Sequence, residues 1–279
     1  MENRYLWKSA VIALVILGFL LVSCSPASPS ISEPTRTPES SPTASPPEVT
    51  MTVEPSPTED SVLVETVTFT TQDDVTIAGT LYGSGSVAII LAHQGTPGAD
   101  QTTWRPFARL LAERGFTALT FDFRGVGQSE GPLSYEKLGI DVKAATGFLQ
   151  ARGYTQIVCA GASMGGTACI LNATDEEYLG LIILASTLRA GVTGDNLSIT
   201  DETLAQLVLP KLFIVAEYEY YIVVRDMEHM VELSPEPKNF IVLSESLHGT
   251  SLFNTDSAEL LTTSMLEFLD GLRNNHSNP

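Results

Sequence analysis

The sequence predicts an α/β fold built on a mostly parallel sheet, and three observations lead to this prediction. After residue 61, short apolar runs alternate repeatedly with segments of helical period. These apolar runs are continuous rather than alternating, which is typical of strands buried on both faces of a parallel sheet. Two alternating, β-branched runs precede them, and they indicate an antiparallel hairpin at the start of the sheet.

Each element follows from a local pattern. The hairpin strands are expected at residues 62–70 and 75–82, on either side of the turn-like sequence Gln72-Asp73-Asp74. The parallel strands are expected at 87–92, 117–123, 157–162, 179–185, 212–216 and 240–243. The helices are expected at 102–114, 135–152, 164–173, 201–207, 223–233 and 257–273. This order places helices on both faces of the sheet, within one domain at residues 61–279.

The first 23 residues have the layout of a signal peptide. Arg4 and Lys8 precede an apolar run at residues 10–22, which is shorter than the roughly 20 residues that a membrane-spanning helix needs. The run ends in Leu21-Val22-Ser23-Cys24, which resembles the lipobox of bacterial lipoproteins. The resemblance implies cleavage before Cys24 and lipidation of that residue, with an ordinary signal peptide or an uncleaved anchor as the alternatives.

Residues 24–60 are expected to form a disordered tether. The stretch 25–60 holds 9 of the 16 prolines, with many serines and threonines and almost no large apolar side chains. Such a segment cannot bury enough surface to offset its ordering entropy. The lipid on Cys24 would therefore hold the folded domain on the extracytoplasmic face of a bacterial membrane.

Composition excludes several classes of function. The chain of 279 residues has 33 acidic and 15 basic side chains, a net charge of −18, so nucleic acid is not an expected partner. Three cysteines are too few for a disulfide framework or a cysteine-rich zinc site, and Cys159 and Cys169 are expected to be small buried hydrophobes. No phosphate-binding loop, metal-ligand cluster or dinucleotide fingerprint occurs in the sequence, so no cofactor or metal is implied.

The sequence Gly161-Ala162-Ser163-Met164-Gly165 carries the strongest chemical signal. It matches G-x-S-x-G, and it stands between an apolar strand and a helical segment, which is the context that this nucleophile turn requires. Small flanking residues allow a tight turn that pushes the central side chain out over the sheet edge. Ligand crevices of open parallel sheets lie at the carboxyl ends of the strands, where this turn is expected.

Several separated motifs make residues 64–272 resemble the α/β-hydrolase family. Besides the turn at Ser163, the chain has Leu91-Ala92-His93-Gln94-Gly95 after the third strand and His248-Gly249 after the last strand. Residues 121–129 are similar to the family's D-x-R-G-x-G-x-S. The resemblance implies an α/β-hydrolase fold with a minimal cap, since residues 187–209 have room for only a loop and one short helix.

A serine nucleophile needs a base within hydrogen-bond reach. Of the four histidines, His93 resembles a structural histidine of the family, His229 lies within a predicted helix and His276 lies in the polar tail. His248 stands where the family carries its catalytic base. It is therefore the expected base for Ser163.

The family's third catalytic residue follows the seventh strand of the sheet, and here that loop contains no aspartate. The resemblance implies Glu219 as the acid of a Ser-His-Glu triad, with Glu217 and Asp226 as alternatives. Because Asp is usual at this position, a non-catalytic binding protein on a degenerate hydrolase fold is a competing interpretation.

The family also needs two backbone amides for the oxyanion, and the amide of Met164 is expected to be one of them. The other is expected from Gln94 or Gly95, because Gln94 stands where relatives often have glycine. Asp122 and Arg124 are interpreted as parts of an internal network that holds their loop.

These residues predict a secreted, lipid-anchored serine hydrolase that cleaves carboxylic esters through an acyl-enzyme. The short cap favours small-molecule esters or the end of a polymer over long buried acyl chains. A peptidase similar to prolyl oligopeptidases is the other enzymatic interpretation. The sequence leaves the substrate and the oligomeric state open.

Overall fold

The central sheet is formed by eight strands in the computed structural model, which describes residues 62–174 and 177–277. The strands of the sheet are β1 (Val64–Thr70), β2 (Thr76–Tyr82), β3 (Val87–Ala92), β4 (Thr117–Phe121), β5 (Gln156–Ala162), β6 (Gly180–Leu184), β9 (Lys211–Ala216) and β10 (Lys238–Leu243). They lie side by side in the order β1-β2-β4-β3-β5-β6-β9-β10. The predicted signal peptide, tether and Cys24 lie outside the described residues.

Strand pairing agrees with the predicted topology. β1 and β2 form an antiparallel hairpin, β2 is antiparallel to β4, and the remaining neighbours are parallel. Strands β3, β4, β6 and β9 are buried along their whole length, because helices cover both faces. The chain runs outward from β3 to β4 and then returns to the other side of β3 as β5, so the strand order reverses at this point. A crevice is expected beyond the carboxyl ends of β3 and β5.

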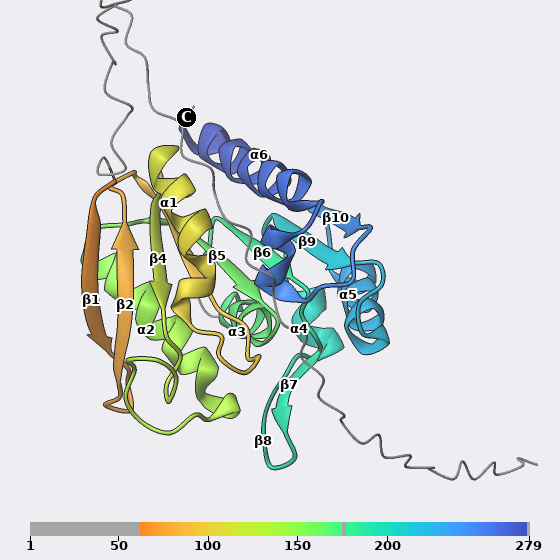
Figure 1. Ribbon diagram of the computed structural model, residues 1–279, viewed down its shortest axis with the longest axis horizontal. Helices are drawn as coiled ribbons and strands as arrows, with labels where there is room; N and C mark the ends of the chain where they lie inside the picture. The colour runs from red at the N-terminus through yellow and green to blue at the C-terminus, as the bar shows by residue number, and fades with distance from the viewer. Residues whose placement is uncertain (1–61, 175–176, 278–279) are drawn as a thin grey trace, which may run out of the picture. The chain divides into compact units, whose positions relative to one another are not determined.

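Helices cover the sheet on both faces, as predicted (Figure 1). The helices are α1 (Arg105–Glu113), α2 (Leu138–Ala151), α3 (Met164–Asn172), α4 (Asp201–Ala205), α5 (Tyr221–Leu233) and α6 (Ala258–Ser277). The sheet has a hydrophobic core on each face, and alternate side chains of β3 point into one core or the other. Ile90 lies in the core that includes α2, α3 and α5, whereas Ile89 and Leu91 lie in the core that includes α1 and α6. The described elements that flank the sheet also include three short 3-10 helices. These are η2 (Gln101–Trp104), η3 (Tyr135–Lys137) and η4 (Gly249–Asn254).

Two elements differ from the sequence-based expectations. The segment after β6 contains a two-stranded hairpin, β7 (Arg189–Val192) and β8 (Asp195–Ser198), before α4. Its strands are too short to show an alternating pattern, although Thr193-Gly194 is a turn signal and Gly194 has a φ of 89°. Helix α6 also continues beyond the predicted end at Arg273, because no glycine or proline interrupts the chain before Pro279.

Candidate catalytic site

Ser163 occupies a sharp turn between β5 and α3. It is the first residue before the helix, with φ 51° and ψ −120°, and its side chain is half-buried. A non-glycine residue at positive φ is strained, and such strain is concentrated at functional sites. The turn therefore places Ser163 at the end of β5 with its side chain partly accessible.

The glycines of the motif are required by close packing. A Cβ on Gly161 would lie 2.3 Å from the carbonyl carbon of Gly165, and a Cβ on Gly165 would lie 2.3 Å from the carbonyl oxygen of Ala92. Either substitution would push the helix away from the sheet. On the other side, the hydroxyl of Ser186 donates a hydrogen bond of 2.8 Å to the carbonyl oxygen of Ser163.

His248 and Glu219 are brought together from two different loops. His248 follows β10 and immediately precedes η4, whereas Glu219 follows β9. The Nδ1 atom of His248 is hydrogen-bonded to Oε1 of Glu219, whose side chain is 1% exposed. An ionised carboxylate only accepts hydrogen bonds, so Nδ1 carries the proton and Nε2 keeps its lone pair. The His248 side chain is 19% exposed, which leaves the ring open to a substrate.

The alternative acids face elsewhere. Glu217 is exposed on the surface of the same loop. Asp226 is buried in α5, where its carboxylate pairs with Arg225 and accepts a hydrogen bond of 2.9 Å from the backbone N–H of Leu188. Asp226 thus anchors the segment after β6, and Glu219 is the carboxylate in contact with His248.

The expected oxyanion donors lie next to one another. Met164 begins α3, and the first amides of a helix have no acceptor within it. Gly95 follows β3, and a Cβ on Gly95 would lie only 2.7 Å from the sulfur of Met164. Gln94, Gly95 and Met164 also line one common pocket. The loop after β3 and the start of α3 therefore lie side by side next to Ser163.

The side chain of Gln94 makes a contact that sequence reasoning missed. Its Oε1 accepts hydrogen bonds from the backbone N–H of Thr250 at 2.7 Å and from the Thr250 hydroxyl at 3.1 Å. Gly249 packs against the same oxygen, since a Cβ there would lie 2.0 Å from it. Gln94 therefore ties the loop after β3 to the loop that carries His248.

The other described histidines with resolved side chains are engaged elsewhere. His93 is fully buried: its Nε2 accepts from the backbone N–H of Phe123 at 3.1 Å, so its Nδ1 donates to the carbonyl oxygen of Gln94 at 2.8 Å. Burial lowers the pKa of His93, which keeps the ring neutral. His229 lies 2.8 Å from Asp201 at the surface of α5. The structural interpretation of His93 agrees with these contacts.

Asp122 and Arg124 belong to an internal network, as interpreted from the sequence. Asp122 accepts from the backbone N–H groups of Gln101 and Gln128 at 2.8 and 2.9 Å. The buried guanidinium of Arg124 pairs with Asp73 at 2.8 Å and Asp141 at 2.7 Å. Hydrogen bonding to Arg124 holds the pKa of Asp73 well below its usual range. The network fixes the loop that follows β4.

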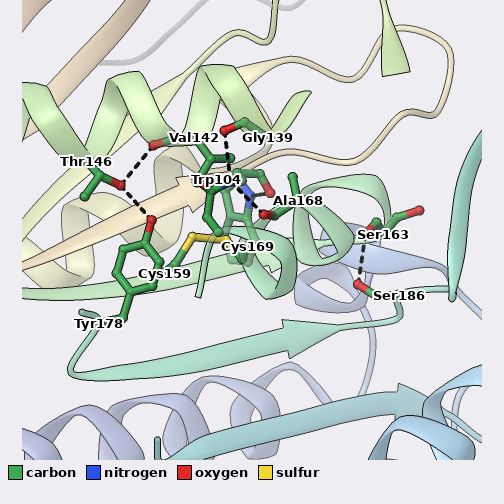
Figure 2. Close-up of a disulfide and its surroundings, with 12 residues drawn as sticks. Trp104, Gly139, Val142, Thr146, Cys159, Ser163, Ala168, Cys169, Tyr178 and Ser186 are labelled. Carbon is green, nitrogen blue, oxygen red and sulfur yellow. Dashed lines mark hydrogen bonds between the residues drawn. A yellow bond between two sulfur atoms is a disulfide. The ribbon is translucent and has the colours of Figure 1, made fainter. Parts of the chain in front are cut away.

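Cys159 and Cys169 form a disulfide, so the expectation that they are separate buried thiols was wrong. Cys159 lies in β5, four residues before Ser163, and Cys169 lies in α3, six residues after it. Figure 2 shows the bridge between strand and helix, with the Ser186–Ser163 hydrogen bond beyond the start of α3. Two cysteines ten positions apart carry no pairing signal in a sequence; only the turn of the chain at Ser163 brings them together.

Three pockets surround the site. One of about 370 Å³ is formed by the loops after β3 and β4 together with Met164. A second, of about 260 Å³, lies between the loop after β3 and η4. A third, of about 470 Å³, is lined by Glu219, His248, Ser251 and two tyrosines, Tyr218 and Tyr220. Open space therefore borders both Met164 and His248.

The fold and the nucleophile turn match a known family. The family model described as the alpha/beta hydrolase fold matches residues 87–207, which include β3, the turn at Ser163 and the segment after β6. The chain has the α/β-hydrolase fold. The same architecture is found in solved structures across nearly their whole length.

Two of these structures are esterases. An esterase of Pyrococcus furiosus is similar to this α/β-hydrolase with a TM-score of 0.64 and 18% identity, over 78% of this chain and 96% of the other. A thermophilic esterase of Thermogutta terrifontis has a TM-score of 0.62 and 19% identity, over 75% and 99% of the two chains. At 18% and 19% identity, the structural similarity shows that these proteins share the fold and nothing more.

Curated relatives extend the similarity at the sequence level. The uncharacterized protein YfhR of Salmonella typhimurium is 27% identical over 238 residues, which cover 74% of this α/β-hydrolase and 81% of the relative. YfhR of Escherichia coli K12 is 26% identical over 229 residues, with 74% and 80% covered.

Within residues 62–174 and 177–277, no group of three or more His, Cys, Asp or Glu side chains is arranged to hold a metal ion. None of the helices in these ranges combines the length and the apolar character that a membrane span requires.

Proposed function

We propose that this α/β-hydrolase cleaves carboxylic esters through an acyl-enzyme on Ser163, with His248 as the base and Glu219 as the third member of the triad. The observation that carries the proposal is the hydrogen bond between His248 Nδ1 and the buried carboxylate of Glu219. This contact leaves Nε2 of His248 available to accept a proton, while a separate strained turn presents the hydroxyl of Ser163.

In the first half-reaction, Oγ of Ser163 attacks the ester carbonyl carbon, and its proton passes to Nε2 of His248. The amide of Met164 and an amide of Gln94 or Gly95 donate hydrogen bonds to the oxyanion, each worth about 3 to 4 kcal/mol. His248 then gives the proton to the leaving alcohol as the carbon–oxygen bond breaks.

Water completes the cycle by the same route. It loses a proton to His248, attacks the acyl carbon, and releases the carboxylic acid as Ser163 recovers its proton. Glu219 stabilises the imidazolium in both half-reactions and keeps the proton of the neutral ring on Nδ1. Glutamate can do this in place of aspartate because the loop after β9 places its longer side chain against His248.

The proposal includes a location outside the cytoplasm, with a lipid on Cys24 and a tether at residues 24–60. The Cys159–Cys169 disulfide supports it, because disulfides persist in oxidising compartments and are rare in the bacterial cytosol. The lipobox-like sequence at residues 21–24 supplies the attachment point.

A pair of isosteric substitutions tests the triad. We expect Glu219→Gln to lower kcat on short-chain p-nitrophenyl esters by about 10³- to 10⁴-fold, because a neutral amide neither fixes the tautomer of His248 nor stabilises its charged form. Glu217→Gln is the matched control on the same loop, and it should leave kcat within about twofold because its side chain is exposed. A loss in Glu217→Gln with none in Glu219→Gln would move the role to Glu217, and turnover unaffected by both would refute the triad.

A further inference from the structure

The end of β6 binds the backbone of Ser163 at both of its polar groups. The N–H of Ser163 donates a hydrogen bond of 2.9 Å to the carbonyl oxygen of Leu184, the last residue of β6. Two residues further on, the hydroxyl of Ser186 donates a bond of 2.8 Å to the carbonyl oxygen of Ser163 (Figure 2). The first bond continues the ladder between β5 and β6, whereas the second comes from a side chain that strand pairing does not require.

A strained residue lies between these two contacts. Ala185 is fully buried and has a φ of 49°, a conformation that residues with a Cβ rarely adopt. The next residue, Ser186, is also fully buried, and a Cβ on Gly166 would lie 2.0 Å from its hydroxyl oxygen. Gly166 therefore leaves the room that this hydroxyl occupies. Strain of this kind is concentrated at functional sites, which points to a role for the end of β6 beside Ser163.

The carbonyl that Ser186 contacts belongs to the same peptide group as the N–H of Met164. A peptide group is planar and trans, so its C=O and N–H point in opposite directions and rotate together. The N–H of Thr167 also donates to this carbonyl, at 3.1 Å, in the first turn of α3. Ser186 adds a second bond from β6. A hydroxyl that fixes the direction of the carbonyl therefore also fixes the direction of the Met164 N–H.

The N–H of Met164 is free to bind an oxyanion. It is the first amide of α3, and no group within residues 62–174 and 177–277 accepts a hydrogen bond from it. A bond donated to the carbonyl of a peptide group polarises the group, which makes its N–H a stronger donor. We propose that Ser186 is a positioning residue, whose hydroxyl orients the Met164 N–H toward the oxyanion and strengthens the bond that it donates. This inference rests on the proposed function.

The test replaces Ser186 by alanine in the full-length protein and compares p-nitrophenyl acetate with p-nitrophenyl thionoacetate. The sulfur of the thiono ester accepts hydrogen bonds much more weakly than oxygen does, so its reaction gains little from the Met164 N–H. We expect Ser186→Ala to lower kcat on the oxygen ester about tenfold, with KM changed less than about twofold. The ratio of kcat/KM for the oxygen ester to that for the sulfur ester should fall by a similar factor.

Thr146→Val is the matched control. It also removes a buried hydroxyl that bonds to a backbone carbonyl, that of Val142 at 3.0 Å, and Thr146 lines none of the pockets around Ser163. It should leave kcat and the ratio unchanged. A wild-type kcat in Ser186→Ala would overturn the proposal. Equal losses on the two esters would also overturn it, because they would show that Ser186 only holds the Ser163 hydroxyl in place.

The peptide group itself can be observed by NMR. Ser163-Met164 and Ser264-Met265 are the two Ser-Met pairs in the sequence, so carbonyl-labelled serine and nitrogen-labelled methionine give two correlations across peptide bonds. Ser264→Ala removes the second signal and so assigns the first. Ser186→Ala should shift the Ser163–Met164 signal and leave the Ser264–Met265 signal, from α6, in place. An unmoved Ser163–Met164 signal would overturn the contact.

Failure of the proposed function is distinguishable from failure of this inference. If the wild type hydrolyses neither ester and Ser163 does not react with a fluorophosphonate, the proposed function fails, and the role of Ser186 fails with it even where the NMR signal shifts. If the wild type hydrolyses the oxygen ester and Ser186→Ala does so equally well, only the role of Ser186 fails.

Discussion

At the scale of single residues, Gln94 connects parts of the site that lie far apart in the sequence. The loop after β3 contains the proposed oxyanion donor, and the loop after β10 carries His248. Gln94 Oε1 holds the second loop to the first through the backbone N–H of Thr250, 156 residues away. Its amide group also donates to the Thr96 hydroxyl at 2.9 Å, which fixes the orientation of the side chain.

Gln94→Met tests this contact without changing the size of the side chain greatly. The substitution keeps the backbone N–H of residue 94 but removes the acceptor, so the buried N–H of Thr250 loses its partner at a cost of about 1 to 3 kcal/mol. We expect a lower free energy of unfolding and a roughly tenfold loss of kcat with a smaller change in KM, since His248 is less well positioned.

Thr250→Val is the matched control for Gln94→Met. It removes only the longer hydrogen bond, from the hydroxyl, and leaves the bond from the Thr250 N–H in place. Its effects on kcat and unfolding should be the smaller of the two. A Gln94→Met protein with the stability and kcat of the wild type would contradict the role assigned to the side chain.

At the scale of elements, the disulfide joins β5 to α3 on either side of the turn at Ser163. The bridge closes a loop of ten residue positions that contains the whole G-x-S-x-G motif. Closing a loop of this length removes chain entropy from the unfolded state. Both cysteines are fully buried, so a reductant reaches the bond only when the domain opens.

The pair Cys159→Ala and Cys169→Ala measures this contribution. We expect the double variant to lose about 2 to 3 kcal/mol of unfolding free energy in guanidinium chloride. Alkylation of the denatured, unreduced wild type, followed by mass measurement, should leave Cys159 and Cys169 unmodified. Cys24→Ala is the control and should not change the unfolding midpoint of the domain. Alkylation of both buried cysteines without reduction would show that the bridge is absent.

The helices and strands also differ in how well they could be predicted from the sequence. The parallel strands and the helix after Ser163 were predicted because continuous apolar runs and helical periodicity are local signals. The β7–β8 hairpin was missed because four-residue strands are too short to display a pattern. The disulfide and the contact between Gln94 and Thr250 were missed for a different reason: each depends on how distant segments meet in space.

At the scale of the whole molecule, the site could be predicted only in part. Ser163 and His248 stand in recognisable motifs, whereas the loop after β9 offered two glutamates that the sequence could not separate with certainty. The fold separates them, since Glu217 is exposed and the side chain of Glu219 turns inward to His248.

The proposed membrane attachment also belongs to the whole molecule. Cys24→Ser removes the thiol to which lipid would be joined, so we expect the protein to move from the membrane fraction to the soluble fraction on expression in a bacterium with a lipoprotein pathway. Ser23→Thr, next to the same position, keeps the cysteine and should remain membrane-bound. An unchanged distribution of Cys24→Ser would favour an uncleaved apolar anchor at residues 10–22.

The central claim is that Ser163 is an activated nucleophile. The most direct measurement treats the folded full-length protein with a fluorophosphonate probe and locates the adduct by mass spectrometry. We predict one adduct per chain, on Ser163, in the wild type and none in Ser163→Ala. A folded wild-type protein that does not react, or a Ser163→Ala protein that reacts equally well, would contradict the account and favour a binding protein built on a hydrolase fold.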